Sequence, residues 1–494
     1  MNTIKELIAK NPIVAWGLFL GTVGIGIGLG LLLSSVAARK AEAEFAYHTP
    51  NQFSETEPRN DVWGKKFPKE YESYSQTKDT TFKSKYNGNK PIDMLEVDPR
   101  LVVLWAGYAF SKDYKQGRGH AYAVEDVHKT LRTGAPNDTN PGPQPGTCWT
   151  CKSPDVPRLM AQMGPTEFYH KKWSELGPEV VNSIGCADCH DSKTMALKIT
   201  RPALAEAFQN MGKDVRNATH QEMRSLVCAQ CHVEYYFKGK DKYLTFPWHN
   251  GFTVENMEAY YDSVGHTDWV HTLSKAPMLK AQHPDFEVFQ MGIHAQRGVS
   301  CADCHMPYRT EGGQKYTDHH IQSPLNNIAN SCQVCHREEA ATLVKNVTDR
   351  QDRIIEARDK LEIALVKAHV EAKAAWDKGV DSLTMVPSLK LIRKAQWRWD
   401  YVAAGHGTAF HAPVEAGRVI SDGIELAQEA RVQLARILLK LGVDSVAYPD
   451  IANKAKAQKF IGLDIPALEA EKQVFLTNVL PKWLSKAKER EAKY

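Results

Sequence analysis

Hydrophobic and polar positions divide the chain into three parts of different character. Residues 13–36 form a run of 24 residues without a charged side chain. Residues 45–340 show little regular spacing of apolar positions. After that point apolar side chains recur every three or four positions, which predicts helices. We therefore divide the chain into residues 1–44, 45–340 and 341–494, the last two forming one structural unit.

The run 13–36 is long enough to span a bilayer. Small residues around Ala37 and Ala43 would also allow cleavage by a signal peptidase. The segment is therefore interpreted either as a signal peptide or as an uncleaved membrane anchor. Both interpretations predict that the body of the protein is exported, to the periplasm, and the second adds association with the inner membrane through residues 13–36.

The C-terminal part carries a helical stripe and further helical stretches. The stripe consists of Leu361, Leu365, Ala368, Ala372 and Trp376. Packing within the monomer is the simplest interpretation of this stripe. Further helices are expected near residues 388–404, 415–441 and 466–489, separated by Pro387, Pro413 and Pro449. With an extended, proline-rich loop over 134–146, the pattern predicts a mainly α protein with little β-structure.

Composition excludes several classes of protein. The chain has 494 residues and a mean hydropathy of −0.43, with one long apolar run, so it is no polytopic membrane protein. Its 62 basic and 58 acidic side chains are well mixed, which predicts no nucleic-acid partner. Ten cysteines in a chain of this length do not make a disulfide scaffold.

Every cysteine lies in a Cys-x-x-Cys unit, and four units continue with histidine. Zinc would need two units per ion, so five units would leave one over, and redox motifs rarely occur five times without a repeated domain. Cys-x-x-Cys-His is the attachment sequence of c-type haem, in which the histidine binds the iron. We therefore predict five covalent haem c groups, at Cys148/Cys151/Lys152, Cys186/Cys189/His190, Cys228/Cys231/His232, Cys301/Cys304/His305 and Cys332/Cys335/His336.

The first unit differs because Lys152 follows its second cysteine. One interpretation is that this haem takes a histidine from elsewhere, or that the pair binds no haem. The other is that the Lys152 amine is the axial ligand. A different ligand on one haem of five indicates that this haem carries the chemistry.

One Cys-x-x-Cys-Lys unit followed by four Cys-x-x-Cys-His units resembles the ammonia-forming pentahaem cytochrome c nitrite reductases. The resemblance extends over nearly the whole chain after the apolar run, including residues 101–107, 118–126, 231–236, 277–283 and 395–400. It implies a haem-packed core, long C-terminal helices that form a homodimer, and reduction of nitrite to ammonium. The expected electron donor is a quinol-linked multihaem cytochrome.

The resemblance also implies a role for individual residues. His120, His294, His319 and His411 match the distal ligands of the third, fifth, second and fourth haem; His320 and His406 are close neighbours of two of them. Arg132, Tyr235 and His283 match the active-site residues. A Ca²⁺ site is implied at the Glu234 carboxylate, the Gln282 side chain and the carbonyls of Tyr235 and Lys280.

Two other functions stay open. An electron-transfer cytochrome would have six-coordinate iron throughout, which Lys152 argues against. A reductase of another nitrogen or sulfur species, such as hydroxylamine or sulfite, would use the same open haem.

Overall fold

The computed structural model describes residues 11–47 and 54–493 and separates into two units. The first unit contains residues 1–52 and 309–316, and the second contains residues 53–308 and 317–494. The apolar helix α2 of the first unit spans Pro12–Tyr47, of which Pro12–Lys40 is long and apolar enough to cross a membrane, with its side chains unburied. Strands β5 (Tyr308–Glu311) and β6 (Gln314–Thr317) form a two-stranded sheet, and Gly312 and Gly313 make the turn between them.

The N-terminal part of the second unit consists of short elements. Two small antiparallel sheets pair β1 (Tyr236–Lys238) with β2 (Tyr243–Thr245), and β3 (Trp269–Val270) with β4 (Pro277–Met278). The helices are α3 (Asn60–Gly64), α4 (Pro68–Ser75), α5 (Met94–Val97), α6 (Arg100–Leu104), α7 (Ala123–Lys129), α8 (Asp155–Met163), α9 (Pro165–His170), α10 (Trp173–Leu176), α11 (Cys186–Cys189), α12 (Pro202–Asn210), α13 (His220–Ala229), α14 (Val254–Ser263), α15 (Asp285–Gln290), α16 (Ile293–Gln296) and α17 (Cys301–His305).

Single 3₁₀ turns connect many of these helices. They are η1 (Gln76–Lys78), η2 (Ala109–Ser111), η3 (His120–Tyr122), η4 (Leu131–Thr133), η5 (Gly146–Trp149), η6 (Val215–Asn217) and η7 (Pro324–Asn326). Short helices and turns of this kind are expected where haem groups replace much of the side-chain core.

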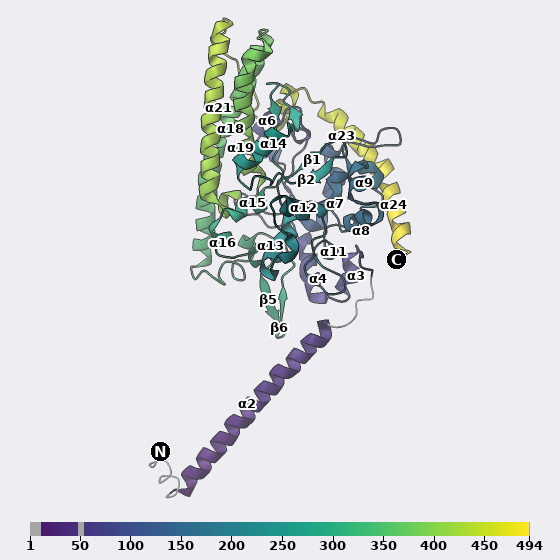
Figure 1. The fold of residues 1–494 in the computed structure, drawn as a ribbon, viewed down its shortest axis with the longest axis vertical. Helices are drawn as coiled ribbons and strands as arrows, with labels where there is room; N and C mark the ends of the chain where they lie inside the picture. Colours follow the sequence, from purple (N-terminus) through teal and green to yellow (C-terminus); the bar gives the residue numbers. More distant parts are fainter. Residues whose placement is uncertain (1–10, 48–53, 494) are drawn as a thin grey trace. The chain divides into compact units, whose positions relative to one another are not determined.

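Three long helices, α18 (Ala340–Asp377), α19 (Ser382–Ala404) and α21 (Pro413–Lys440), lie side by side (Figure 1). A side chain at Gly423 would come 2.6 Å from Leu361 and 3.3 Å from Arg398, so this glycine allows α21 to approach both neighbours. The predicted stripe on α18 therefore packs within the monomer. The remaining C-terminal elements are α20 (Thr408–His411), α22 (Lys454–Phe460), α23 (Ile465–Val474), the π-turn η8 (Phe475–Val479) and α24 (Leu480–Glu491).

The helix expected from residue 388 begins earlier than predicted. Asp381 caps α19 by accepting a hydrogen bond from the Thr384 N–H, and the helix continues through Pro387. A proline inside a helix leaves the carbonyl four residues earlier without its partner. That residue, Leu383, is 85% exposed, so water can bind the freed carbonyl. Pro387 is therefore an internal residue of α19, and the prediction that it precedes the helix was wrong.

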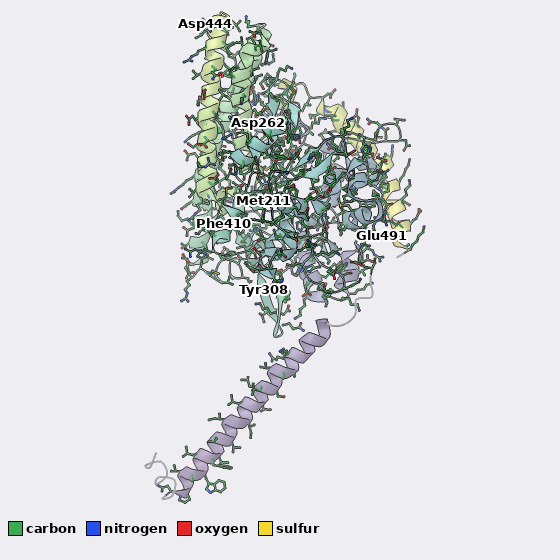
Figure 2. The ribbon with its side chains drawn as sticks, viewed as in Figure 1. Met211, Asp262, Tyr308, Phe410, Asp444 and Glu491 are labelled. Atoms are coloured by element: carbon green, nitrogen blue, oxygen red, sulfur yellow. The ribbon has the colours of Figure 1, made fainter. Side chains whose placement is uncertain are left out.

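Side chains from the short and the long helices together fill the second unit (Figure 2). Its core is rich in tryptophan, whose large apolar body needs a partner for its N–H when buried. Trp397 donates to the Val254 carbonyl and Trp149 to the Trp173 carbonyl, both at 2.9 Å. The prediction of a mainly α chain with long C-terminal helices and little β-structure is confirmed.

Candidate functional site

Each Cys-x-x-Cys-His unit forms one helical turn. The amides of His190, His232 and His336 donate to the carbonyl of the first cysteine of their unit at 2.9 Å, and His305 ends α17. Residues three and four positions apart lie on the same face of a helix, so both thiols and the imidazole project to one side. All ten cysteines lie in the described part of the chain and none forms a disulfide.

The fifth unit lies at the surface, unlike the other four. Nine of the ten cysteines are partly buried, whereas Cys335 is exposed. It lies in the segment before α18, in which residues 333–339 are all exposed. A haem attached to Cys332 and Cys335 would cover part of this surface.

Each of the four attachment histidines faces a second imidazole from a distant part of the chain. The ring centres lie 6.0 to 6.3 Å apart in the pairs His190–His319, His232–His120, His305–His411 and His336–His294. A metal ion bonded to one nitrogen of each ring at about 2.0 Å separates the two centres by roughly 6 Å. The four gaps thus fit an iron ion between each pair, and the four distant histidines are those that the resemblance implied.

Backbone carbonyls hold several of these rings by the nitrogen that points away from the gap. Nδ1 lies 2.8 Å from the Met195 carbonyl in His190, 2.8 Å from the Gln322 carbonyl in His305, and 2.7 Å from the Thr317 carbonyl in His319. Such a contact fixes the tautomer and leaves Nε2 to bind a metal.

The Lys152 unit is anchored differently. Arg201 donates to the carbonyls of Thr150 and Ser153 at 2.9 and 2.8 Å. It also pairs with Asp188, which lies between the two cysteines of the Cys186/Cys189 unit. Trp149 stacks on Trp173 with the ring centres 5.0 Å apart. Among the described residues, the Lys152 amine has no hydrogen-bond or ion-pair partner. The loop is therefore rigid, while the amine stays available as a ligand.

The three predicted active-site residues surround this unit. Arg132 follows its cap residue Thr130, and its guanidinium lies 4.3 Å from the centre of the Phe110 ring. Within the described chain Arg132 pairs with no carboxylate. Its charge and that of Lys152 both act on the Cys148 thiol, so the three groups lie close together.

Tyr235 and His283 are in the same neighbourhood. Burial raises the pKa of the Tyr235 hydroxyl well above its usual range, with Cys151 and Cys148 next in effect. Burial lowers the pKa of His283 well below its usual value, and the charge of Lys152 lowers it further. Tyr235 is therefore a protonated hydroxyl and His283 a neutral imidazole, and both can form hydrogen bonds with a small polar molecule.

Glu234 is fully buried without a basic partner in the described chain. Its carboxylate accepts from the Tyr261 hydroxyl at 2.8 Å and from the Gln282 N–H at 2.6 Å. Burial raises its pKa well above the usual range. The Gln282 side-chain amide lies 3.3 Å from the Lys280 carbonyl. A buried carboxylate beside amide and carbonyl oxygens is a donor set that suits a hard cation, which would compensate the charge.

Asp268 and Asp400, to which the sequence analysis gave no role, hold this segment together with Glu234. Three successive amides, of Lys280, Ala281 and Gln282, donate to Asp268 at 2.9 Å, Asp400 at 3.1 Å and Glu234 at 2.6 Å. The Lys280 ammonium also pairs with Asp400 at 2.8 Å. The signal in the sequence is that Asp400 belongs to the segment 395–400 that carries the resemblance.

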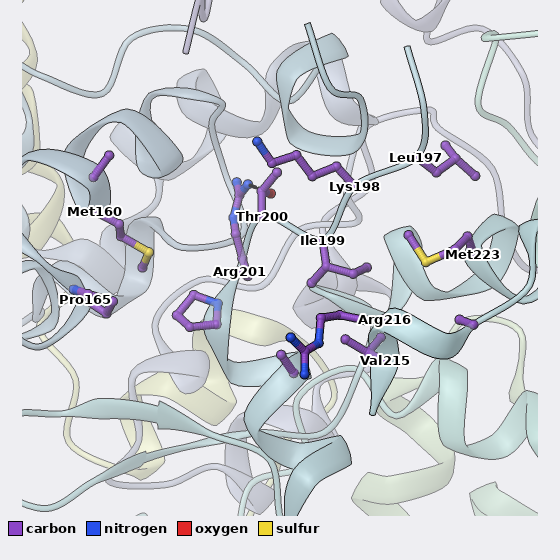
Figure 3. A pocket seen from close by; sticks show the side chains of 14 residues that line it. Met160, Pro165, Leu197, Lys198, Ile199, Thr200, Arg201, Val215, Arg216 and Met223 are labelled. Atoms are coloured by element: carbon purple, nitrogen blue, oxygen red, sulfur yellow. Dashed lines mark hydrogen bonds between the residues drawn. The ribbon is translucent and has the colours of Figure 1, made fainter. Parts of the chain in front are cut away.

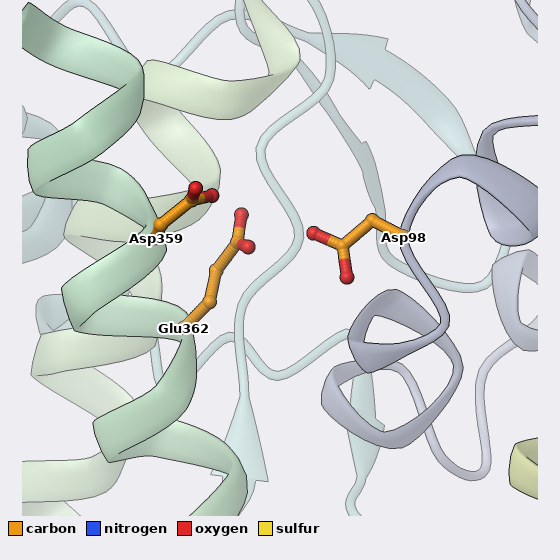
Figure 4. A group of neighbouring side chains, drawn as sticks. All are labelled: Asp98, Asp359 and Glu362. Atoms are coloured by element: carbon orange, nitrogen blue, oxygen red, sulfur yellow. The ribbon is translucent and has the colours of Figure 1, made fainter. Parts of the chain in front are cut away.

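A second carboxylate cluster is neutralised by arginine. Asp98, Asp359 and Glu362 have oxygens within 4.8 Å of one another (Figure 4). Arg100 pairs with all three at 2.6 to 2.9 Å, and Arg358 pairs with Glu362 at 3.1 Å. These contacts link α6 to α18, so the cluster joins two helices and needs no metal ion.

A pocket of about 750 Å³ lies between α8, α12 and α13, with Met160, Ile199, Arg216 and Met223 among its lining residues (Figure 3). None of the predicted ligands or active-site residues lines it. We therefore assign it no part in the site described above.

Comparisons with known proteins agree with this geometry. The chain matches the cytochrome c552 family over residues 59–492. It is 58% identical to cytochrome c-552 of Parabacteroides distasonis over 476 residues and 56% identical to that of Bacteroides fragilis over 475, with 96% of each chain covered. A solved structure of cytochrome c nitrite reductase from Desulfovibrio desulfuricans, described as having two calcium sites, has a TM-score of 0.74 and 32% identity, covering 84% of this chain and 91% of its own.

These matches extend over nearly the whole chain, far beyond the haem-attachment units. They confirm both the resemblance expected from the sequence and the prediction of covalent haem c. The chain belongs to the cytochrome c552 family.

Proposed function

We propose that this protein reduces nitrite to ammonium at a haem attached to Cys148 and Cys151, with Lys152 as the protein ligand of its iron. One contrast carries the proposal. Four attachment histidines each face a second imidazole, whereas the Lys152 amine has no partner among the described residues. Iron held by one protein ligand keeps a coordination position for substrate.

The proposed cofactors are five covalent haem c groups, one in each unit, and one Ca²⁺. Conversion of nitrite to ammonium takes six electrons and eight protons. Haem, when bound, supplies one-electron transfer and, at the Lys152 unit, an iron position for the substrate. The thiols of Cys151 and Cys231 affect each other's pKa, as do those of Cys228 and Cys301, which supports short electron-transfer steps between these units.

Arg132 is the proposed anion-binding residue. A guanidinium carries a positive charge and donates in a fixed fork, which suits the two oxygens of nitrite. Since it has no carboxylate partner in the described chain, no internal ion pair must break when an anion binds. The Phe110 ring beneath it limits where the guanidinium can move.

Tyr235 and His283 are the proposed hydrogen-bonding and proton-donating residues. Burial keeps the Tyr235 hydroxyl protonated, so it can donate a hydrogen bond to a nitrite oxygen. The neutral His283 imidazole can donate at one nitrogen and accept at the other, which allows it to pass protons.

Calcium is proposed to bind the Glu234 carboxylate, the Gln282 side-chain oxygen, and the carbonyls of Tyr235 and Lys280. The buried charge of Glu234 supports this assignment. Rotation of the Gln282 amide by half a turn would present its oxygen to the point that its nitrogen now faces. The ion would hold the two segments that carry Tyr235 and His283 in register.

We further propose a periplasmic homodimer that receives electrons from a quinol-linked multihaem cytochrome. The apolar span Pro12–Lys40 supports export and, if uncleaved, attachment to the inner membrane. N-terminal sequencing of the mature protein tests the anchor, because a start near residue 38 or 44 would remove it.

The test of the function is a stoichiometry. The purified protein, with all five haems verified by mass, receives dithionite-reduced viologen and nitrite, and ammonium is counted against viologen oxidised. We expect six viologens per ammonium. Nitrite consumption without ammonium would refute the proposal, and untouched nitrite would favour an electron-transfer cytochrome. Relative kcat/KM for nitrite, hydroxylamine and sulfite identifies the preferred substrate.

A matched pair of variants links the activity to the unusual ligand. Lys152→His gives the first unit the sequence of the other four, and we expect slower ammonium formation with all haems retained. Lys193→His changes a lysine that is 72% exposed and should leave the rate unchanged.

A further inference from the structure

The four attachment histidines differ in what their Nδ1 nitrogen faces. In His190 and His305 it meets a backbone carbonyl at 2.8 Å. In His336 it lies 3.9 Å from the Glu338 carboxylate, and both side chains are about half exposed. In His232, whose side chain is 53% exposed, it lies 3.6 Å from the Asp285 carboxylate, which is 20% exposed. His232 is therefore the one member of the four with a largely buried anion behind its ring.

The backbone fixes this arrangement from both sides. Asp285 is the first residue of α15, and its amide donates to the His283 carbonyl. The next amide, of Phe286, donates to the His232 carbonyl at 3.0 Å. A side chain at Gly405 would come 3.3 Å from the Asp285 carboxylate, so the loop after α19 closes over it. Little freedom remains for the carboxylate to turn away from the imidazole.

We propose that Asp285 is a positioning residue that lowers the reduction potential of the haem on Cys228 and Cys231. At 3.6 Å the carboxylate lies beyond hydrogen-bond distance of Nδ1, so it acts on a metal-bound ring through its charge, which makes the ring a more basic ligand. A more basic ligand and a nearby negative charge both favour ferric over ferrous iron. The affected step is the addition of one electron to the iron, in which no bond breaks and the proton stays on Nδ1.

This role deepens the proposed function, on which it rests only for the presence of haem at that unit. His283 and Asp285 are two residues apart, so one segment carries a proposed active-site histidine and the charge that tunes a neighbouring haem. The Cys231 thiol of this unit and the Cys151 thiol of the Lys152 unit affect each other's pKa, so this unit is a neighbour of the proposed reaction site. A lower potential there would make electrons pass more readily to the reaction site.

The test is potentiometry of the holoprotein, followed by visible and electron paramagnetic resonance spectra. In Asp285→Asn we expect one haem potential to rise, with the one-electron equilibrium shifted on the order of tenfold, or about 59 mV. Glu338→Gln makes the same chemical change behind His336, where solvent screens the charge, and should shift its haem much less.

Unchanged potentials in Asp285→Asn, with five haems present, would overturn the proposal. So would a similar rise of several potentials, or an equal effect of Glu338→Gln, because either indicates a general structural change. If Asp285→Asn assembles without this haem, Asp285→Glu and Asp285→Gln compare charge at constant size, and only the Gln variant should show the rise. A holoprotein that shifts as expected but makes no ammonium would refute the proposed function alone.

Discussion

The ion pair between Lys280 and Asp400 gives a stability prediction that can be worked from the structure. Asp400 is fully buried on α19 and accepts from the Lys280 ammonium at 2.8 Å and the Ala281 amide at 3.1 Å. In Asp400→Asn the ammonium stays buried without its counter-charge, facing the rings of Trp105 and Phe110 about 5 Å away. Removing one partner of a buried pair costs about 3–5 kcal/mol.

This cost converts to a measurable shift in melting temperature. With an unfolding entropy of about 2.1 cal/mol/K per residue, a unit of roughly 430 residues loses about 1 °C per kcal/mol. We therefore expect Asp400→Asn to melt about 3–5 °C below the wild type, measured by scanning calorimetry of the holoprotein. The control is Asp377→Asn, which breaks an exposed pair with Lys373 one turn away and should cost less than about 0.5 kcal/mol.

A double variant separates the effect of the unpaired charge from the effect of altered side-chain packing. In Lys280→Met/Asp400→Leu no unpaired charge remains, so this protein should melt above Asp400→Asn. A melting temperature of Asp400→Asn within about 1 °C of the wild type would refute the reasoning. It would mean that water or another group reaches the ammonium once the carboxylate is gone.

Four further predictions concern the site and its surroundings. Lys152→His should slow nitrite reduction while all five haems stay attached, and an unchanged rate would show that the axial ligand does not set the chemistry. Arg132→Lys should raise KM for nitrite about tenfold, because a point charge cannot donate as a fork, and steady-state kinetics measures this. Glu234→Gln should weaken calcium binding 10- to 100-fold, by metal analysis after dialysis against a chelator. Burial lowers the pKa of Lys472 to about 8, so between pH 8 and about 10.5 the unfolded chain binds more protons than the folded one. The free energy of unfolding should therefore rise with pH in this range, and Lys472→Met should abolish the rise in a series of denaturant titrations.

Local patterns predicted the elements of the fold better than their exact ends. The stripe from Leu361 to Trp376 correctly indicated a helix with one buried face, because a period near 3.6 depends only on neighbouring residues. The start of α19 depended on whether the carbonyl freed by Pro387 could reach water, which is a property of the folded surface. The expected helix over 466–489 is interrupted by the π-turn Phe475–Val479, just before Pro481, which has no N–H to donate to the carbonyl four residues earlier.

The haem-attachment units were readable from the sequence because both cysteines and the histidine lie in one helical turn. The second imidazoles were not readable, because each comes from a separate part of the chain. His120 belongs to a 3₁₀ turn more than one hundred residues before His232, whereas His411 ends a helix more than one hundred residues after His305. Only the resemblance to a family selected them before the structure was known.

The carboxylates behind residues 280–282 illustrate why a charged residue in an apolar stretch can matter more than a motif. Asp268, Asp400 and Glu234 come from three different elements, yet each accepts one amide from consecutive residues. A strand partner would satisfy the same amides without any buried charge. Carboxylates instead fix the segment while adding negative potential beside Gln282 and His283, which a bound cation can offset. The segment is therefore rigid only when its charges are balanced, so calcium removal and Asp400→Asn should both disturb His283 through the same backbone.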